Sequence, residues 1–240
     1  MKNKWLFNFT SLILTTVLLN PAIWAQTSDD SDDSKVKRFE VGGQISGLLI
    51  NRIDASDEVF RQFGFPESAK NYRFLDIGFG GRFTYNVNRR LAFEGEVNYF
   101  PSSPTVNELV AARKFANVPY LGGKKAQFLG GVKYGFRHSK YGFFGKIRPG
   151  AIRFTAYPKV AGRFVSPMSD DVLVFSTEVP ATFFNVDVGG VFEYYPNRRT
   201  VFRVDVGDTI IRYNAQQPKE INPSFTRHNL QTSVGFGFRF

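Results

Sequence analysis

The stretch "FLDIGFGGRFTYNVNRRLAFEGEVNY", residues 74–99, alternates apolar and polar side chains on both sides of a three-residue turn. Leu75, Ile77 and Phe79 fall on one face of its first segment, whereas Asp76 and Arg82 fall on the other. A period of two indicates a β-strand with one apolar face. Two such segments joined by "NRR" therefore predict an antiparallel hairpin.

The same alternation recurs along the chain and predicts eight strands. They cover residues 38–49, 74–87, 91–99, 126–138, 142–155, 182–195, 200–213 and 227–240. Each is long enough to cross a bilayer when tilted, which takes roughly 9 to 11 residues. The connections alternate between short ones (88–90, 139–141, 196–199) and long ones (50–72, 100–125, 156–181, 214–226). This order predicts an all-β, eight-stranded antiparallel up-and-down transmembrane barrel, with short periplasmic turns at one end and long extracellular loops at the other.

Two of the segments break the alternation. Pro149 stands between Ile147 and Ile152, and Gly207 stands before Ile211, so that the later isoleucines fall on the other face. Because proline cannot donate to a strand ladder and one extra residue restores the pattern, we predict a β-bulge near Pro149 and another near Gly207. The alternative is that both strands end before these residues.

The polar face of the strands carries acidic and basic residues in nearly equal number, together with several glycines. Such a face suits a narrow, crowded lumen better than a solvated exterior. Because enclosed charges are costly unless they are paired, we expect an ion-pair network inside the barrel. Its predicted members are Asp76, Arg82, Glu94, Glu96, Lys133, Arg137, Lys146, Arg148, Asp187, Glu193, Arg203, Asp205 and Arg239.

The apolar face is predicted to contact lipid, because aromatic residues occur at both of its ends and aliphatic residues between them. Such aromatic rims are typical of outer-membrane barrels. Arg153, near the long-loop rim, is the one charge that this assignment places on the face. The aromatic residues are Tyr85, Phe93, Phe136, Tyr194, Phe202, Phe238 and Phe240 at the short-turn end, and Tyr99, Phe128, Phe154 and Tyr213 at the long-loop end.

The composition favours β-strands, and it argues against a disulfide-bonded protein, a thiolate metal site and a nucleic-acid-binding protein. The 240 residues include 27 phenylalanines and 22 glycines but no cysteine, which excludes disulfides and thiolate metal sites. The net charge of +10 is scattered over strands and turns rather than gathered on one helix or stripe. A nucleic-acid partner is therefore not expected.

The first 37 residues are predicted to lie outside the barrel. Lys2 and Lys4 precede an apolar run, and Ala25 is a small residue suited to cleavage, so residues 1–25 are interpreted as a secretory signal peptide. The apolar run is short for a spanning helix, which needs ~20 residues. Residues 26–37 contain "SDDSDDS" and are interpreted as an acidic, flexible leader, which leaves 38–240 for the barrel.

The signal peptide, the eight strands, the alternating turn lengths and the terminal "GFGFRF" (235–240) resemble the small outer-membrane β-barrel families typified by the OmpA membrane domain, OmpX and OmpW. The resemblance covers residues 38–240 and implies a bacterial outer-membrane location, with lipids and lipopolysaccharide as neighbours. It also implies that the barrel-assembly machinery reads Phe236, Phe238 and Phe240 as an assembly signal. We expect a monomer.

Three functional hypotheses remain open at this point. The first is a structural or binding protein that meets an unknown extracellular ligand through its long loops. The second is a narrow or gated pore for small solutes, although eight strands leave an interior roughly filled by side chains. The third is an enzyme that modifies lipid A, because some eight-stranded barrels do so with His, Ser and an acid on the outer-leaflet side. His138 and Ser139 are next to each other in sequence, but they fall at a tight turn on the side assigned to the periplasm. His228 lies near Ser224 and Thr226 in sequence, but no carboxylate is clearly placed beside it. We expect no enzymatic activity.

The long loops offer two weaker signals. Ser103 and Pro104 begin a stretch of helix-forming residues that predicts a short helix over 103–116. Several loop carboxylates could attract cations, namely Asp54, Asp57, Glu58, Asp170 and Asp171. Charged loop residues are usually solvated, so neither a metal site nor a cofactor is expected.

Overall fold

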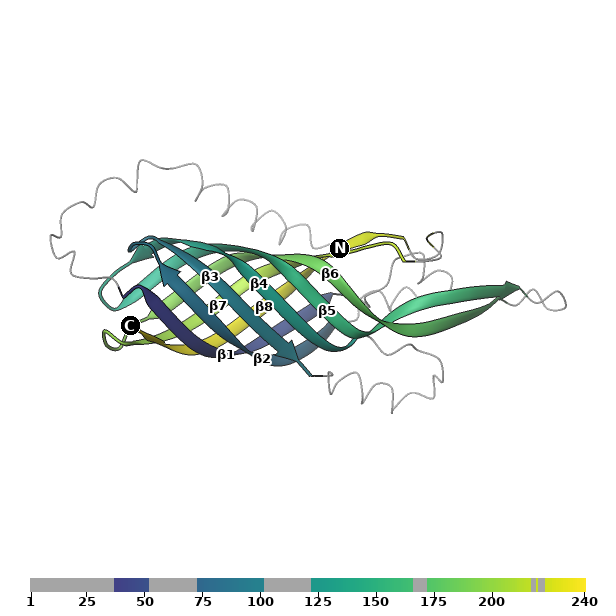
Figure 1. Ribbon diagram of the computed structural model, residues 1–240, viewed down its shortest axis with the longest axis horizontal. Helices are drawn as coiled ribbons and strands as arrows, with labels where there is room; N and C mark the ends of the chain where they lie inside the picture. Colours follow the sequence, from purple (N-terminus) through teal and green to yellow (C-terminus); the bar gives the residue numbers. More distant parts are fainter. Residues whose placement is uncertain (1–36, 52–72, 102–121, 166–171, 217–218, 220–222) are drawn as a thin grey trace, which may run out of the picture. The chain divides into compact units, whose positions relative to one another are not determined.

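Eight antiparallel strands close into a barrel (Figure 1). The strands are β1 (Phe39–Asn51), β2 (Arg73–Asn86), β3 (Leu91–Phe100), β4 (Gly122–Arg137), β5 (Tyr141–Val165), β6 (Val172–Tyr194), β7 (Thr200–Tyr213) and β8 (Phe225–Arg239). The computed structural model describes residues 37–51, 73–101, 122–165, 172–216, 219 and 223–240. The predicted fold class, an up-and-down eight-stranded barrel, is confirmed.

Each strand pairs with its neighbours in sequence, and β1 pairs with β8 to close the barrel. The stagger of the strands follows from tracing paired residues once around the wall. The row runs through Thr226, Arg212, Phe184, Ala151, Phe128, Val97, Gly81, Gly43 and Phe236. It returns to β8 ten residues from where it began (236 − 226 = 10). A shear of this size in eight strands corresponds to a tilt of about 40°, which leaves room inside for side chains.

Strands β5 and β6 are much longer than the sequence pattern predicts. Beyond Ala156 on β5 and before Phe184 on β6, the two strands pair with each other and with no other described strand, and their hairpin continues from Tyr157↔Val179 to Val165↔Val172. The hairpin projects past the barrel wall (Figure 1). The prediction of a loop over 156–181 was therefore wrong for most of its length, because Pro158, Gly162 and Pro180 conceal the alternation of this segment.

The two predicted bulges are absent. Pairing of β5 with β6 keeps one register from Tyr141↔Tyr194 to Phe154↔Ala181, which includes Pro149. Pairing of β7 keeps one register with both neighbours through Gly207. Register shifts occur instead between Gly122 and Lys125, where Gly123 has a left-handed φ of 57°, and in the β5–β6 extension.

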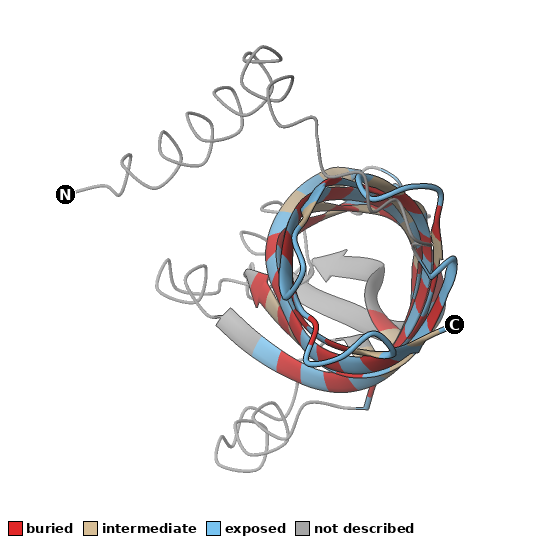
Figure 2. Ribbon diagram, turned by 90° about the vertical axis from the view of Figure 1, so that its left-hand side faces the viewer, coloured by how far each residue is buried: buried red, intermediate tan, exposed pale blue. Residues whose placement is uncertain are grey.

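Because the register is unbroken, the side chains after Pro149 and Gly207 stay on alternate faces, and apart from Thr209 the inward ones are apolar. Ile152, Phe154, Ile211 and Tyr213 point into the barrel and are buried. Placing Phe154 and Tyr213 in a lipid-facing aromatic rim was therefore wrong. The alternation of buried and exposed residues is visible along every strand of the barrel wall (Figure 2).

Several predictions fall on residues outside the described ranges. These are the signal peptide, residues 26–36 of the leader, the helix over 103–116 and the acidic loop residues Asp54, Asp57, Glu58, Asp170 and Asp171. Within the described part of the chain, no helix is long and apolar enough to span a membrane.

Candidate functional site in the barrel lumen

The half of the lumen nearest the short turns holds a network of buried ion pairs. Arg203 lies at its centre and donates from Nε to Asp205 Oδ2 at 2.7 Å and from Nη2 to Glu94 Oε2 at 2.9 Å. Lys133 pairs with Glu193 and lies 3.3 Å from Glu94 Oε1. Inward side chains of β3, β4, β6 and β7 thus meet at Arg203.

The second part of the network lies next to Arg203 and is centred on two cations from β5. Arg148 pairs with Glu96 and donates from Nε to Asp187 Oδ2 at 3.0 Å. Lys146 Nζ lies 2.8 Å from Asp187 Oδ2 and 3.3 Å from Asp205 Oδ1. Each of the two cations lies within 4.0 Å of at least two carboxylates, so removing either cation leaves more than one acid without a partner.

The described ion pairs of the lumen involve seven acidic and seven basic side chains. They are Glu40, Asp76, Glu94, Glu96, Asp187, Glu193 and Asp205, with Arg82, Lys125, Lys133, Arg137, Lys146, Arg148 and Arg203. A balanced set satisfies the requirement that buried charges be paired. Such a set holds the strands in one register, because a shift by one residue turns its members outward.

On the long-loop side of these charges lies a layer of uncharged polar side chains. Gln44 Nε2 donates to Asn98 Oδ1 at 2.8 Å, and Asn98 Nδ2 donates to Gln127 Oε1 at 3.0 Å. Gln127 Nε2 donates in turn to Gln231 Oε1 at 3.0 Å, and the Thr209 hydroxyl donates to the same oxygen at 2.7 Å. This chain of amides runs from β1 through β3 to β4, and from β4 it crosses the lumen to β8.

The long-loop end of the lumen is filled by apolar side chains. The rings of Phe183 and Tyr157 have centroids 4.8 Å apart, as do those of Phe183 and Tyr213. The pair Lys125–Asp76, with Nζ to Oδ2 at 2.7 Å, lies beside this cluster, and Lys125 stands 5.3 Å from the centroid of Phe154. The buried members are Leu48, Ile50, Phe100, Ile152, Phe154, Tyr157, Ala181, Phe183, Ile211 and Tyr213, and we call them the apolar plug.

The short-turn end is closed by Tyr195, which follows β6. Its hydroxyl donates to Glu193 and accepts a 2.7 Å hydrogen bond from Arg137 Nε. Burial, reinforced by the Glu193 carboxylate, raises the pKa of Tyr195 above its ordinary value, so the phenol keeps its proton. Arg239 stacks on the same ring at 4.1 Å and donates to the Asn197 carbonyl.

Of the thirteen residues that the sequence indicated for the lumen, the structure places eleven in this one network, and Asp76 lies apart from them, paired with Lys125. Arg239 differs, because it lies half-buried at the short-turn rim over Tyr195 and forms no ion pair that the described residues reveal. Sequence reasoning missed Glu40, Lys125 and Tyr195. The first lies on the inward face of β1 and could have been found from the alternation, whereas Lys125 was assigned to a loop and Tyr195 to the end of a strand.

The outer wall is apolar over most of its area. Ile45, Val234 and Phe128 expose 65%, 63% and 54% of their surface, and most other outward positions are apolar or glycine. Phe236, Phe238 and Phe240 also point outward, and Phe240 stacks on Phe39 of β1 at the closing seam.

A polar patch interrupts this wall near the long-loop end of β7 and β8. His228 Nδ1 lies 2.6 Å from Asp208 Oδ2, and both side chains are about half exposed. Arg212 donates to the hydroxyls of Thr226 and Ser224 at 3.0 and 3.1 Å. The sequence had placed no carboxylate beside His228. The bulge predicted at Gly207 would turn the Asp208 side chain to the inward face, and for this reason Asp208 was not predicted beside His228.

His138 and Ser139 are not brought into a comparable arrangement. They lie at the exposed turn before β5, where His138 stacks on Tyr141 with centroids 5.4 Å apart. In the described part of the chain, no three metal-ligating side chains gather in one place.

Comparisons with known proteins concern the fold alone. No protein-family model matches the chain, and no curated protein matches its sequence. Among solved structures, the Neisserial surface protein A matches with a TM-score of 0.47 and 12% identity, covering 84% of this chain and 97% of its own. Ail from Yersinia pestis matches with a TM-score of 0.42 and 11% identity, covering 85% of this chain and 100% of its own. The Escherichia coli outer membrane protease OmpT matches with a TM-score of 0.34 and 9% identity, covering 85% of this chain and 97% of its own.

Proposed function

We propose that this chain is an integral outer-membrane barrel with a sealed lumen, and that it acts by presenting its long-loop end to the exterior. The observation that carries the proposal is the inverted distribution of polarity, with apolar side chains exposed on the wall and charged ones enclosed. In water, such an exposed apolar belt would cause aggregation, whereas in a bilayer it is the required exterior. The resemblance to small outer-membrane barrels points to the same location.

The long β5–β6 hairpin supports a binding or structural role. It carries the sheet beyond the barrel, and its outer edges have no partner among the described strands. An edge of this kind can accept a further strand, which is one route by which sheets recognise extended peptides.

A conducting pore is disfavoured by the stacking of three filled layers. The ion network, the amide layer and the apolar plug each span the lumen, and Arg148, Gln127 and Phe154 are all fully or almost fully buried. An ion would have to displace all three. We therefore expect planar bilayers that contain the refolded barrel to stay electrically silent. Discrete current steps that scale with protein concentration would overturn the sealed lumen.

Lipid modification is a second candidate, favoured by the pair of His228 and Asp208 on the lipid-facing wall. An acid that orients a histidine is a recurring part of hydrolytic sites. Against it, the nearby hydroxyls of Ser224 and Thr226 accept hydrogen bonds from Arg212. Mass spectra of lipid A from cells with and without the protein separate the two candidates. A mass change that disappears in His228→Ala would favour the enzyme.

A further inference from the structure

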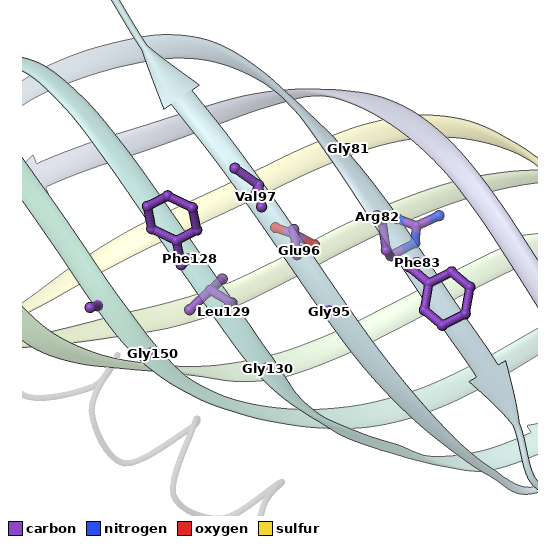
Figure 3. A pocket seen from close by; sticks show the side chains of 11 residues that line it. Gly81, Arg82, Phe83, Gly95, Glu96, Val97, Phe128, Leu129, Gly130 and Gly150 are labelled. Atoms are coloured by element: carbon purple, nitrogen blue, oxygen red, sulfur yellow. The ribbon is translucent and has the colours of Figure 1, made fainter.

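A groove on the outer wall lies across β2, β3, β4 and β5. Its floor is formed by Gly81, Gly95 and Gly130, and Phe83, Val97 and Phe128 rise beside it (Figure 3). The groove holds about 690 Å³ and ends on β5 at Ala151. All of these side chains point outward, so the groove opens toward the surroundings of the barrel rather than toward its lumen.

The glycine floor is not required by the packing of the wall. A Cβ added at Gly95 would meet no atom within 4 Å, and at Gly81 and Gly130 it would meet a single carbonyl oxygen at 3.9 Å. Inward-facing glycines differ. At Gly189 an added Cβ would lie 2.9 Å from the Val206 carbonyl carbon, with other backbone atoms nearer still. The outward positions have room for a side chain, and their glycines keep a depression open.

Two cations lie on the same wall, directly beyond the groove toward the long-loop end. Arg153 follows Ala151 on the outward face of β5, and Lys124 lies on the same side of β4. Their positions are adjacent, because Arg153 pairs with Ala126 and the Lys124 amide donates to Thr155 Oγ1 at 2.9 Å. Both side chains are exposed, and neither is ion-paired with an acid of the described chain. One anion on the outer wall can pair with both cations.

We propose that this surface binds a phosphate-bearing membrane lipid, with the phosphate between Lys124 and Arg153 and an acyl chain in the glycine-floored groove. Ala151, which lines the groove and pairs with Phe128, is the next outward residue of β5 before Arg153. Guanidinium and ammonium groups bind phosphate through charge-assisted hydrogen bonds, and cations near a headgroup layer attract anionic lipid. The proposal rests on the proposed membrane location and adds a specific site to it.

The size of the groove favours a lipid over a second copy of the chain. It is lined by eleven residues, whereas a stable protein interface takes about 20 to 30 residues a side. A second copy docked through the same wall would also leave the two cations without a counter-charge, since the outward residues around the groove are apolar. A free phosphate ion would use Lys124 and Arg153 but would leave the groove empty.

The test is native mass spectrometry of the refolded barrel in a neutral detergent, titrated with phosphatidic acid or phosphatidylcholine. Wild type is expected to prefer phosphatidic acid, and Lys124→Gln/Arg153→Gln to lose about thirtyfold of that affinity. Gly95→Leu is expected to weaken binding of both lipids, because the new side chain occupies the groove. Millimolar inorganic phosphate is expected not to displace the lipid.

Two matched controls make the test decisive. Arg198→Gln/Arg199→Gln makes the same charge change at the exposed short turn, and Gly190→Leu fills an outward glycine outside the groove, where the nearest atom is the Phe144 carbonyl oxygen at 4.0 Å. Equal losses in these controls, an unchanged preference in the Lys124/Arg153 variant, or dimers in place of bound lipid would overturn the site. If the barrel still inserts into bilayers, such a result leaves the proposed function standing.

Discussion

Replacing Arg203 with methionine is expected to lower the free energy of unfolding by about 3–5 kcal/mol. The guanidinium is fully buried and contacts Glu94 and Asp205 through four nitrogen–oxygen hydrogen bonds. Methionine fills a similar volume but leaves both carboxylates without their main partner. Equilibrium unfolding of the refolded barrel in urea measures the change.

The control for this experiment is Arg198→Met, which removes the same charge from the exposed turn between β6 and β7. It is expected to change the unfolding free energy by at most about 0.5 kcal/mol. If Arg203→Met were as mild as this control, the ion network would not be a tightly paired core, and the lumen would have to be hydrated.

Replacing Val234 with arginine is expected to cost about 2–4 kcal/mol of stability in a bilayer. Val234 points outward midway along β8, between Ile45 of β1 and Val204 of β7, and it exposes 63% of its surface. A cation at this position must enter the apolar interior of the membrane. Urea unfolding of the barrel in lipid vesicles measures the difference between wild type and variant.

The control is Ser139→Arg, which places the same side chain at the exposed turn before β5, outside the apolar belt. It is expected to be close to neutral. Should Val234→Arg be equally neutral, the wall of the barrel would face water, and the sequence would describe a soluble barrel with an unusual surface.

The assignment of faces was predictable from the sequence because a strand has a strict period of two. A shift by one residue would expose every inward charge, so residues such as Glu94, Asp187 and Arg203 could belong to one face only. The alternating turn lengths then determine the order of the strands. These two features were sufficient to predict the closed barrel and most of the charged residues in the lumen.

The apolar plug was not predictable in the same way. If every inward position is taken to be polar, Ile152 and Ile211 resemble breaks in register, and a bulge is predicted before each of them. A lumen has to be filled, but it does not have to be polar throughout. Pairs between strands, such as Lys125 with Asp76 in the lumen or His228 with Asp208 on the outer wall, also depend on the stagger of the strands, which spacing in the sequence does not give.

The central claim is that alternate residues of the wall face lipid while the others face a sealed interior. Because the chain contains no cysteine, single cysteines along β8 can each carry a nitroxide label without background. Labels at Leu230, Thr232, Val234, Phe236 and Phe238 in vesicles are expected to relax strongly with oxygen, which partitions into lipid, and weakly with a water-soluble nickel complex. Strong relaxation by nickel at Val234, with little effect of oxygen, would contradict the account.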